Sequence, residues 1–394
     1  MVTWLRKNLF RSVGDSITTI VIGSLAIWVL YRFLRFVFVT GRWEIVRTNL
    51  SLFITGSWPE DELWRVVVAI VAVSFMAGLI AGFIARQRRE EVPDDAEPGR
   101  PWLLDILSRT WPLLLTVLLL LSLAQTVGPW LLAVGSLAAF AAGRFIGPLL
   151  PRRSGAALVV AALVVGLSAV WLLVAGVEFD SWGGLLLNLF LAAISIALCF
   201  PLGVLLALGR RSQFPILRTM STSYIELFRG VPLIALLLMA NVALGFFIPT
   251  DLAPGKVVRA IVILVLFTSA YVAEIVRGGL QSVPIGQIEA GRALGLSPVS
   301  VTRLIVLPQA LRNVIPALVG QFISLFKDTT LAGAAMGLTD LLAGPQASTA
   351  QPAFRGQGLI AETLVFVLLI FWAGSYTMSN ESQRLEARLG VGER

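Results

Sequence analysis

Long apolar runs, separated by short polar segments that carry arginine, follow one another along the whole chain. A helix needs about 20 predominantly apolar residues to cross the hydrocarbon core of a bilayer, and these runs predict ten membrane-spanning helices. The expected spans are Ile17–Phe38, Val66–Ala85, Trp111–Val127, Trp130–Leu149, Ala156–Val177, Gly184–Leu208, Val231–Phe247, Val257–Ile275, Ala310–Leu325 and Leu359–Tyr376. The pattern therefore predicts an all-α, polytopic membrane protein.

Two polar breaks divide the chain into regions. Residues 86–109 begin with RQRREEVPDDAEPGR, which has too few apolar side chains to pack and indicates a solvated loop. A second break, GVEFDSWGG, separates the fifth predicted span from the sixth. We therefore predict an N-terminal membrane region over residues 1–182 with five helices, a second five-helix region over 183–380, and a tail over 381–394.

The composition removes most enzyme classes. Hydrophobic residues make up 57% of the chain and charged residues 14%, whereas soluble domains carry about 25% charged residues, so a soluble globular enzyme is nearly excluded. The chain has no histidine and a single cysteine, Cys199. Histidine-dependent catalysis, imidazole metal sites, intrachain disulfides and thiolate clusters are therefore excluded. We predict no catalytic residue and no metal site, with Cys199 inert in the core or facing lipid.

The charges orient the predicted helices. Lys and Arg total 31 against 23 Asp and Glu, giving a net charge of +8, and the basic residues lie between apolar runs, which favours a membrane over nucleic acid. Cytoplasmic loops carry the excess of Lys and Arg, and alternating spans satisfy this rule when both termini are cytoplasmic. The first hairpin is the exception. Arg42 and Arg47 then lie outside, and either Arg32 and Arg35 lie in the outer half of the first span, or that span is shorter and the stretch after it lies on the surface.

The most patterned polar stretch is residues 281–309, QSVPIGQIEAGRALGLSPVSVTRLIVLPQ. Pro284 suits the first turn of a short helix, and Gly295 can supply the left-handed residue that ends it. Ser297 then fits an N-cap and Pro298 the first residue of a second helix. This pattern predicts a rigid helix–turn–helix on the cytoplasmic side. On local physics alone, a structured loop without further function explains it equally well.

The residue pattern within this stretch resembles the EAA signature of permease subunits of ATP-binding cassette (ABC) importers. The matching positions are Glu289, Ala290, Gly291, Gly295, Ile305, Leu307 and Pro308. In that family the loop holds a coupling helix that docks into a cleft of the ATP-binding subunit. Gly291 departs from the commoner alanine. We expect Glu289 to order the loop by hydrogen bonding and Pro308 to interrupt the helix that follows.

Other segments resemble the polar amino-acid class of these permeases. They are YIELFRGVPL from Tyr224, SAYVAEIVRGGLQ from Ser269 and QFISLFKDTTL from Gln321. The resemblance covers about residues 183–389, so it implies that the last five helices form the permease core. The long N-terminal half and the tail further resemble one permease subunit of general L-amino-acid importers, but the N-terminal half has no motif with assignable chemistry.

The resemblance also implies location and partners. It implies a bacterial inner membrane, contact with membrane lipid, a separate ABC ATP-binding subunit, a second homologous permease and a periplasmic amino-acid-binding protein. The chain has no phosphate-binding loop, because its only Gly-Lys pair, Gly255-Lys256, is followed by Val257. We therefore expect this chain to bind no cofactor, and ATP to be bound and hydrolysed by the partner.

Ionisable residues inside spans are costly and are candidates for function. Glu274 lies near the inner end of its span with Arg277 one turn away, and Asp328 follows Lys327 at the end of the next span. Both sets can be explained as neutralising pairs at an interface. The functional alternative is that Glu274, Asp328 and Thr329 line the path of an amino acid.

Three function classes compete. An importer permease explains the capped cytoplasmic loop. A secondary transporter driven by an ion gradient explains ten spans and buried charges, but it does not explain that loop. A membrane-embedded enzyme is disfavoured, because histidine and paired carboxylates are missing from the sequence. We therefore prefer the importer permease, with the ion-driven transporter as the alternative.

Overall fold

A computed structural model describes residues 8–91, 102–243 and 253–389 of the chain. Its helices are α2 (Val13–Arg35), η1 (Phe36–Thr40, a π-helix), α3 (Glu44–Thr48), α4 (Leu50–Ile54), α5 (Leu63–Glu91), α6 (Trp102–Leu123), α7 (Gly128–Ile146), α8 (Gly155–Val174), α9 (Gly184–Arg210), α10 (Pro215–Gly230), α11 (Leu233–Val242), α13 (Lys256–Ser282), α14 (Ile285–Ala293), α15 (Pro298–Val301), η6 (Thr302–Val306, a π-helix), α16 (Leu307–Met336), α17 (Gly344–Thr349) and α18 (Ile360–Leu389). The 3₁₀ turns η2 to η5 are Glu60–Glu62, Gly147–Leu149, Arg152–Ser154 and Phe179–Ser181.

The spanning helices confirm the all-α, polytopic prediction. Within the described residues, eight helices are long and apolar enough to cross a membrane, and the pair α10–α11, bent by 96°, can supply a ninth. The apolar part of α6, Thr110–Leu123, is shorter. Every predicted span overlaps one of these helices, although the last residues of the predicted Val231–Phe247 span lie outside the described part of the chain.

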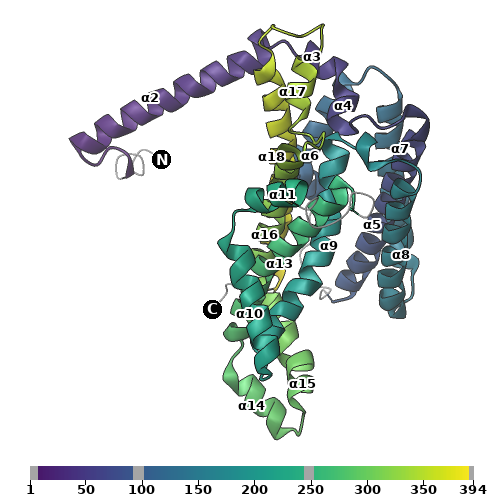
Figure 1. The fold of residues 1–394 in the computed structure, drawn as a ribbon, viewed down its shortest axis with the longest axis vertical. Coiled ribbons are helices and arrows are strands. Elements are labelled where there is room, and N and C mark those ends of the chain that lie inside the picture. Colours follow the sequence, from purple (N-terminus) through teal and green to yellow (C-terminus); the bar gives the residue numbers. More distant parts are fainter. Residues whose placement is uncertain (1–7, 92–101, 244–252, 390–394) are drawn as a thin grey trace.

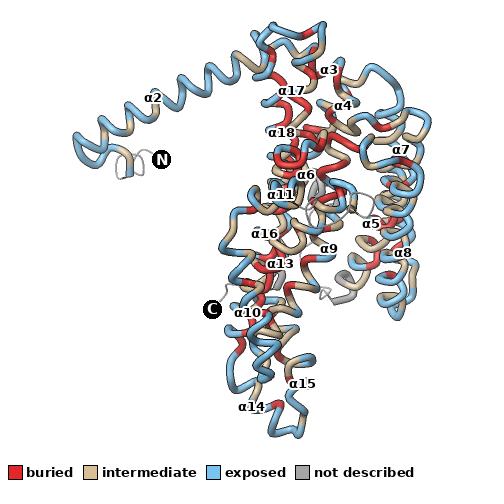
Figure 2. Tube along the Cα trace, viewed as in Figure 1, coloured by how far each residue is buried: buried red, intermediate tan, exposed pale blue. Residues whose placement is uncertain are grey.

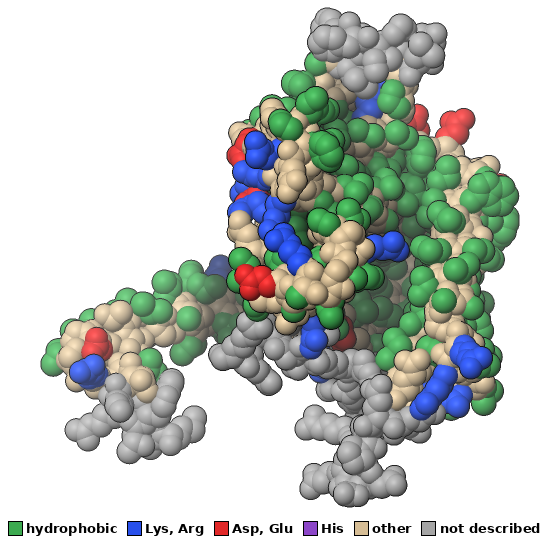
Figure 3. All heavy atoms as spheres, turned by 90° about the horizontal axis from the view of Figure 1, so that it is seen from below, with side chains coloured by type: hydrophobic (Ala, Val, Ile, Leu, Met, Phe, Trp, Pro, Cys, Tyr) green, Lys and Arg blue, Asp and Glu red, His purple; other side chains and the backbone are tan. Residues whose placement is uncertain are grey.

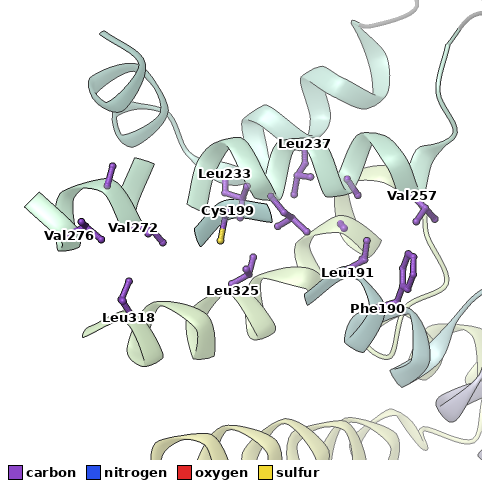
Figure 4. Close-up of a cluster of buried hydrophobic side chains, with 14 of the residues drawn as sticks. Phe190, Leu191, Cys199, Leu233, Leu237, Val257, Val272, Val276, Leu318 and Leu325 are labelled. Carbon is purple, nitrogen blue, oxygen red and sulfur yellow. The ribbon is translucent and has the colours of Figure 1, made fainter. Parts of the chain in front are cut away.

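The second half of the chain packs around α13, which lies against both α9 and α16. Its buried positions recur every three or four residues, which is one face of a helix: Val257, Ala260, Leu264, Thr268, Val272, Val276 and Leu280. Figure 4 shows Val272 and Val276 from this face at one end of the buried cluster that also contains Leu233 and Leu237 of α11 and Leu325 of α16. Cys199 is fully buried in the same cluster, so of the two positions expected for it, the core and the lipid-facing surface, the structure has the core.

The N-terminal half contributes a compact group of α5, α7 and α8 that lies beside this bundle (Figure 1). Helix α5 crosses α7 and the turn η3 at two pairs of glycines: Gly78 and Gly82 belong to α5, and Gly143 and Gly147 belong to α7 and η3. A Cβ at Gly78 would lie 2.1 Å from the Phe140 carbonyl oxygen, and one at Gly143 2.2 Å from the Phe75 carbonyl oxygen. Only glycine permits this backbone approach, which is a common way for helices to associate in membranes.

Helix α2 stands apart from the bundle. It extends away to one side in Figure 1, and Figure 2 shows it exposed along its length; none of its residues is buried. The helix continues through η1 to Thr40, so Arg32 and Arg35 lie inside the helical segment. The first hairpin therefore begins with one long helical segment, Val13–Thr40, and not with a shorter one.

The end of the molecule with α3 and α17 lies opposite the end with α14 and α15 (Figure 1). The N-terminal half joins the second half closely here. Phe53 of α4 packs edge-on against Phe366 of α18, with ring centroids 5.2 Å apart. Gly56 has a φ of 70°, and a Cβ there would lie 2.4 Å from the Gly183 Cα. The two halves are therefore locked together at this end.

Candidate coupling loop and polar clusters

The polar stretch 281–309 folds into the predicted helix–turn–helix. Helix α14 follows Pro284, and Gly295 adopts a φ of 76°, the left-handed conformation expected of a helix stop. The Ser297 hydroxyl accepts a hydrogen bond from the Ser300 N–H at 3.2 Å, and Pro298 begins α15. The predicted caps are confirmed, and α14 and α15 form one extremity of the molecule (Figure 1).

The prediction that Pro308 interrupts the following helix is wrong. The segment Pro298–Met336 is a continuous helical run of 39 residues, in which η6 precedes α16. A proline lacks the N–H that a helix interior needs. The π-helical turn η6 ends at Val306, and it changes the register of the backbone hydrogen bonds. Pro308 therefore lies in the first turn of α16, and the helical run continues.

Some of the signature residues pack inside the loop, and others are exposed on its surface. Gly291 is buried, and a Cβ there would lie 2.8 Å from the Ile305 Cδ1 atom and 3.1 Å from the Val301 Cγ2 atom. Gly291 and Ile305 therefore hold α14 against η6. Leu307 is half-buried, whereas Ala290 and Pro308 are exposed.

Glu289 behaves differently from the prediction that it orders the loop. Its side chain is exposed, and no hydrogen bond or ion pair of its carboxylate occurs within the described residues. The caps at Gly295 and Ser297 supply the order instead. Three large apolar side chains are also exposed here: Ile285 is 72%, Leu294 79% and Val299 75% exposed.

This extremity therefore presents an acidic group among apolar side chains on a rigid frame. Figure 3 views the molecule from this side, with acidic and basic side chains beside green apolar ones. Exposed apolar patches rimmed by polar residues mark interaction sites. The arrangement suits docking to another protein.

Glu274 is the centre of an arginine cluster at the C-terminal ends of three helices. Its Oε1 accepts a hydrogen bond from the Arg277 Nε at 2.8 Å, and its Oε2 one from the Arg210 Nη1 at 3.1 Å. The Arg229 Nη1 lies 3.9 Å from the same carboxylate, and Arg210 also bonds Glu226 at 2.9 Å. The predicted pair with Arg277 is confirmed, and it extends into a connection between α9, α10 and α13.

A second polar cluster lies at the opposite end of α9. The Asn188 Nδ2 donates to the Thr329 Oγ1 at 2.9 Å and to the Asp340 Oδ2 at 3.3 Å, while its Oδ1 accepts from the Leu341 N–H at 2.9 Å. All three polar side chains are at most 1% exposed. Burial raises the pKa of Asp340 to about 6, although hydrogen bonds from the Ala343 N–H and Asn188 oppose the rise.

The predicted path residues are therefore not brought together. Glu274 is bound to Arg210 at one end of α9, and Thr329 to Asn188 near the other, about 33 Å apart at the rise of an α-helix. Asp328 is half-buried and Lys327 exposed, and no ion pair joins them within the described residues. Asn188 and Asp340 were missed as partners because 152 residues separate them in the chain.

Within the described residues, no group of three or more Cys, Asp and Glu side chains could hold a metal ion. What the arrangement offers is mechanical: a docking surface, an ionic cluster that ties three helices, and a buried hydrogen-bonded hub that ties α9 to the segment after α16.

Comparison with known proteins identifies the family. A family model described as binding-protein-dependent transport system inner membrane component matches residues 199–380. The chain is 34% identical to the inner membrane amino-acid ABC transporter permease protein YhdY of Escherichia coli K12, over 99% of this chain and 93% of that protein. It is 37% identical to the glutamate/glutamine/aspartate/asparagine transport system permease protein BztC of Rhodobacter capsulatus, over 88% and 78% respectively.

Among solved structures, the crystal structure of an amino acid ABC transporter with histidines matches with a TM-score of 0.46 and 29% identity, over 51% of this chain and 90% of that chain. The relatives are multi-pass permease subunits, not enzymes, and they imply an ATPase and a paired permease as partners in an inner membrane. The chain therefore belongs to the family of inner-membrane permease subunits of amino-acid ABC transporters.

Proposed function

We propose that this permease carries L-amino acids inward through an ATP-driven importer and receives them from a periplasmic binding protein. The relatives are named for amino-acid transport, and one of them for glutamate, glutamine, aspartate and asparagine. Both termini are cytoplasmic in this proposal, and ATP is bound by the partner ATPase. The loop of α14 and α15 is the contact with that ATPase.

The single observation that carries the coupling role is the rigid, exposed tip of this loop. Its order comes from the left-handed Gly295 and the Ser297 cap, which lie within the loop itself. Ile285, Leu294 and Val299 then remain available for a partner surface. A loop held in this way can pass a push from the ATPase to the membrane helices without first becoming ordered.

A displacement of the loop by the ATPase can reach the membrane helices in two ways. Helix α13 ends at Ser282, three residues before α14 begins, and it carries Glu274 near this end. On the other side, α15 runs without a break into α16. A displacement of α14 therefore moves α13 and α16 together, and it acts directly on the ionic cluster of Glu274 with Arg210, Arg229 and Arg277.

We infer separate roles for the proposed path residues. Glu274 lies where the path would open to the cytoplasm, with its arginines as competing partners for a substrate carboxylate. Asp328 lies towards the outer end of α16, where its carboxylate could meet a substrate ammonium group. Thr329 is bonded to Asn188, so it would reach a substrate only when the outer hub opens.

The test is transport by the complex reconstituted in vesicles with its ATPase, partner permease and binding protein. Glu289→Lys and Gly295→Asp should leave the protein in the membrane but reduce uptake and ATPase stimulation at least about tenfold. Glu381→Lys changes an exposed carboxylate elsewhere, on α18, and serves as the matched control. Full uptake by both loop variants would contradict the coupling role.

The energy source is tested in the same vesicles. Uptake should require ATP on the side of the vesicle membrane that carries the loop of α14 and α15. It should continue when ionophores dissipate the ion gradients. Uptake that survives ATP depletion but stops with the ionophores would contradict the importer function.

A further inference from the structure

The end of the molecule opposite the coupling loop has a basic seam between two chain segments. One segment, residues 41–49, follows η1 and includes α3; the other, residues 351–358, precedes α18. Figure 1 shows α3 and α17 at the far end of the molecule and not on its lateral surface. If the coupling loop faces the cytoplasm, this seam faces the water outside the membrane.

Hydrogen bonds fix the seam along its length. The Arg42 guanidinium donates to the Gln357 carbonyl oxygen at 2.8 Å and to its side-chain oxygen at 3.2 Å, while the Arg42 N–H bonds the buried Glu362 carboxylate at 3.1 Å. The Gln351 Nε2 donates to the Asn49 Oδ1 at 2.6 Å. Beneath them, Ile45, Val46, Phe354 and Leu359 are buried in one cluster. The seam is therefore a fixed surface.

Two further arginines on this surface make no internal polar contact within the described residues. Arg47 and Arg355 are exposed, and no side-chain hydrogen bond or ion pair of either occurs within the described residues. Basic residues are disfavoured in outer loops. Lys256 and Lys327 are also exposed on this side, whereas two of its arginines have internal partners. Arg65 pairs with Glu62, and Arg259 donates to the Pro254 carbonyl oxygen at 2.6 Å.

We propose that Arg42, Arg47 and Arg355 form a docking surface for an acidic face of the soluble amino-acid-binding protein. This inference rests on the proposed function, and it assigns a binding role to residues 41–49 of the N-terminal half. Charge complementarity carries the choice of partner: the seam has three guanidiniums, and Glu44 is the one exposed acid that the two segments contribute. Charged rims raise association rates and align partners more than they add raw affinity.

The test compares two double variants in the reconstituted complex. Arg47→Glu/Arg355→Glu reverses both charges, Arg47→Lys/Arg355→Lys keeps them, and Arg42 stays unchanged because it holds the seam together. The probe is the binding protein that stimulates the wild-type ATPase, titrated at low salt. The reversed variant should need about tenfold more of it for half-maximal stimulation, with unchanged basal ATPase activity, whereas the lysine variant should stay within about twofold.

Salt provides an independent readout. Stimulation of the wild type should weaken as ionic strength rises, and the reversed variant should lose this dependence. Equal titrations for all three proteins would overturn the docking surface alone, because wild-type stimulation would still support the importer. A wild-type complex that hydrolyses no ATP and transports no amino acid would overturn both proposals. A defect found only in vesicles of anionic lipid, and not in detergent, would assign the seam to lipid and overturn the protein contact.

Discussion

The crossing of α5 and α7 gives the sharpest quantitative prediction. In Gly78→Ala the new methyl group would lie 2.1 Å from the Phe140 carbonyl oxygen, where real contacts of this kind do not fall below 3.0 Å. The two helices must therefore separate by about 1 Å. A gap of that size forfeits a quarter to a half of the attraction between the atoms that face each other. Overpacking of this kind costs about 1–3 kcal/mol.

Helix propensity acts in the opposite direction, because alanine is favoured over glycine by about 1 kcal/mol inside a helix. Gly166 of α8 shows the effect of helix propensity alone, because a Cβ there would meet no atom within 4 Å. Gly166→Ala should therefore leave the protein equally or more stable. Gly78→Ala should lose about 1–2 kcal/mol, which corresponds to a fall of a few degrees in the temperature of unfolding.

The assay is the fraction of detergent-purified protein that stays monodisperse in size-exclusion chromatography after heating. Gly143→Ala should resemble Gly78→Ala, because its methyl group would lie 2.2 Å from the Phe75 carbonyl oxygen. The double variant should lose less than the sum, because the helices are already apart. If Gly78→Ala and Gly166→Ala have the same melting temperature, the close crossing is refuted.

Four other measurements test the remaining sites. Gly291→Ala should keep uptake within about twofold of wild type, because its nearest neighbour is the flexible Ile305 Cδ1, whereas Gly291→Phe should abolish it; equal uptake would contradict the packing role. Glu274→Gln should reduce uptake about tenfold while the subunits still co-purify, because three arginines lose their shared carboxylate. The pKa of Asp340 in the folded protein is raised to about 6 from 3.8, so the folded protein binds this proton more tightly than the unfolded one. The free energy of unfolding should therefore fall by up to about 3 kcal/mol as pH rises from 4 to 6, and stay level above pH 6. Melting curves of Asp340→Asn should lack this fall, and an identical pH dependence would refute the assignment. After replacement of the native cysteine, a cysteine at Ala353 should react with an impermeant reagent on whole cells and one at Gln287 only after permeabilisation; the reverse result would invert the orientation.

Local signals account for what could be read from the sequence. Apolar runs set the spans, and Gly295, Ser297 and Pro298 set the turn and cap of the coupling loop, because each acts within about four residues of itself. Pro308 was misjudged because the neighbouring π-helical turn, which accommodates it, has no simple sequence signal. The paired glycines of α5 and α7, spaced four apart within apolar runs, carried a readable signal for close helix packing.

Tertiary clusters escaped prediction for a different reason. Nothing in the local pattern around Asn188 indicates its bonds to Thr329 and Asp340, and nothing around Asp340 indicates its burial. Glu274 was paired with Arg277 because they lie one turn apart, but Arg210 and Arg229 come from other helices. Contacts of this kind depend on how the helices are arranged, which the periodicity of one segment does not specify.

The unbroken run from Pro298 to Met336 spans about 58 Å at the rise of an α-helix. One end belongs to the loop proposed to meet the ATPase, and the other carries Thr329 and leads into the segment that holds Asp340. A helical run of this length connects the two ends of the molecule, so binding at one end is coupled to binding at the other, and at equilibrium such coupling is reciprocal. If nucleotide binding changes the affinity for the binding protein by some factor, the binding protein must change the affinity for nucleotide by the same factor.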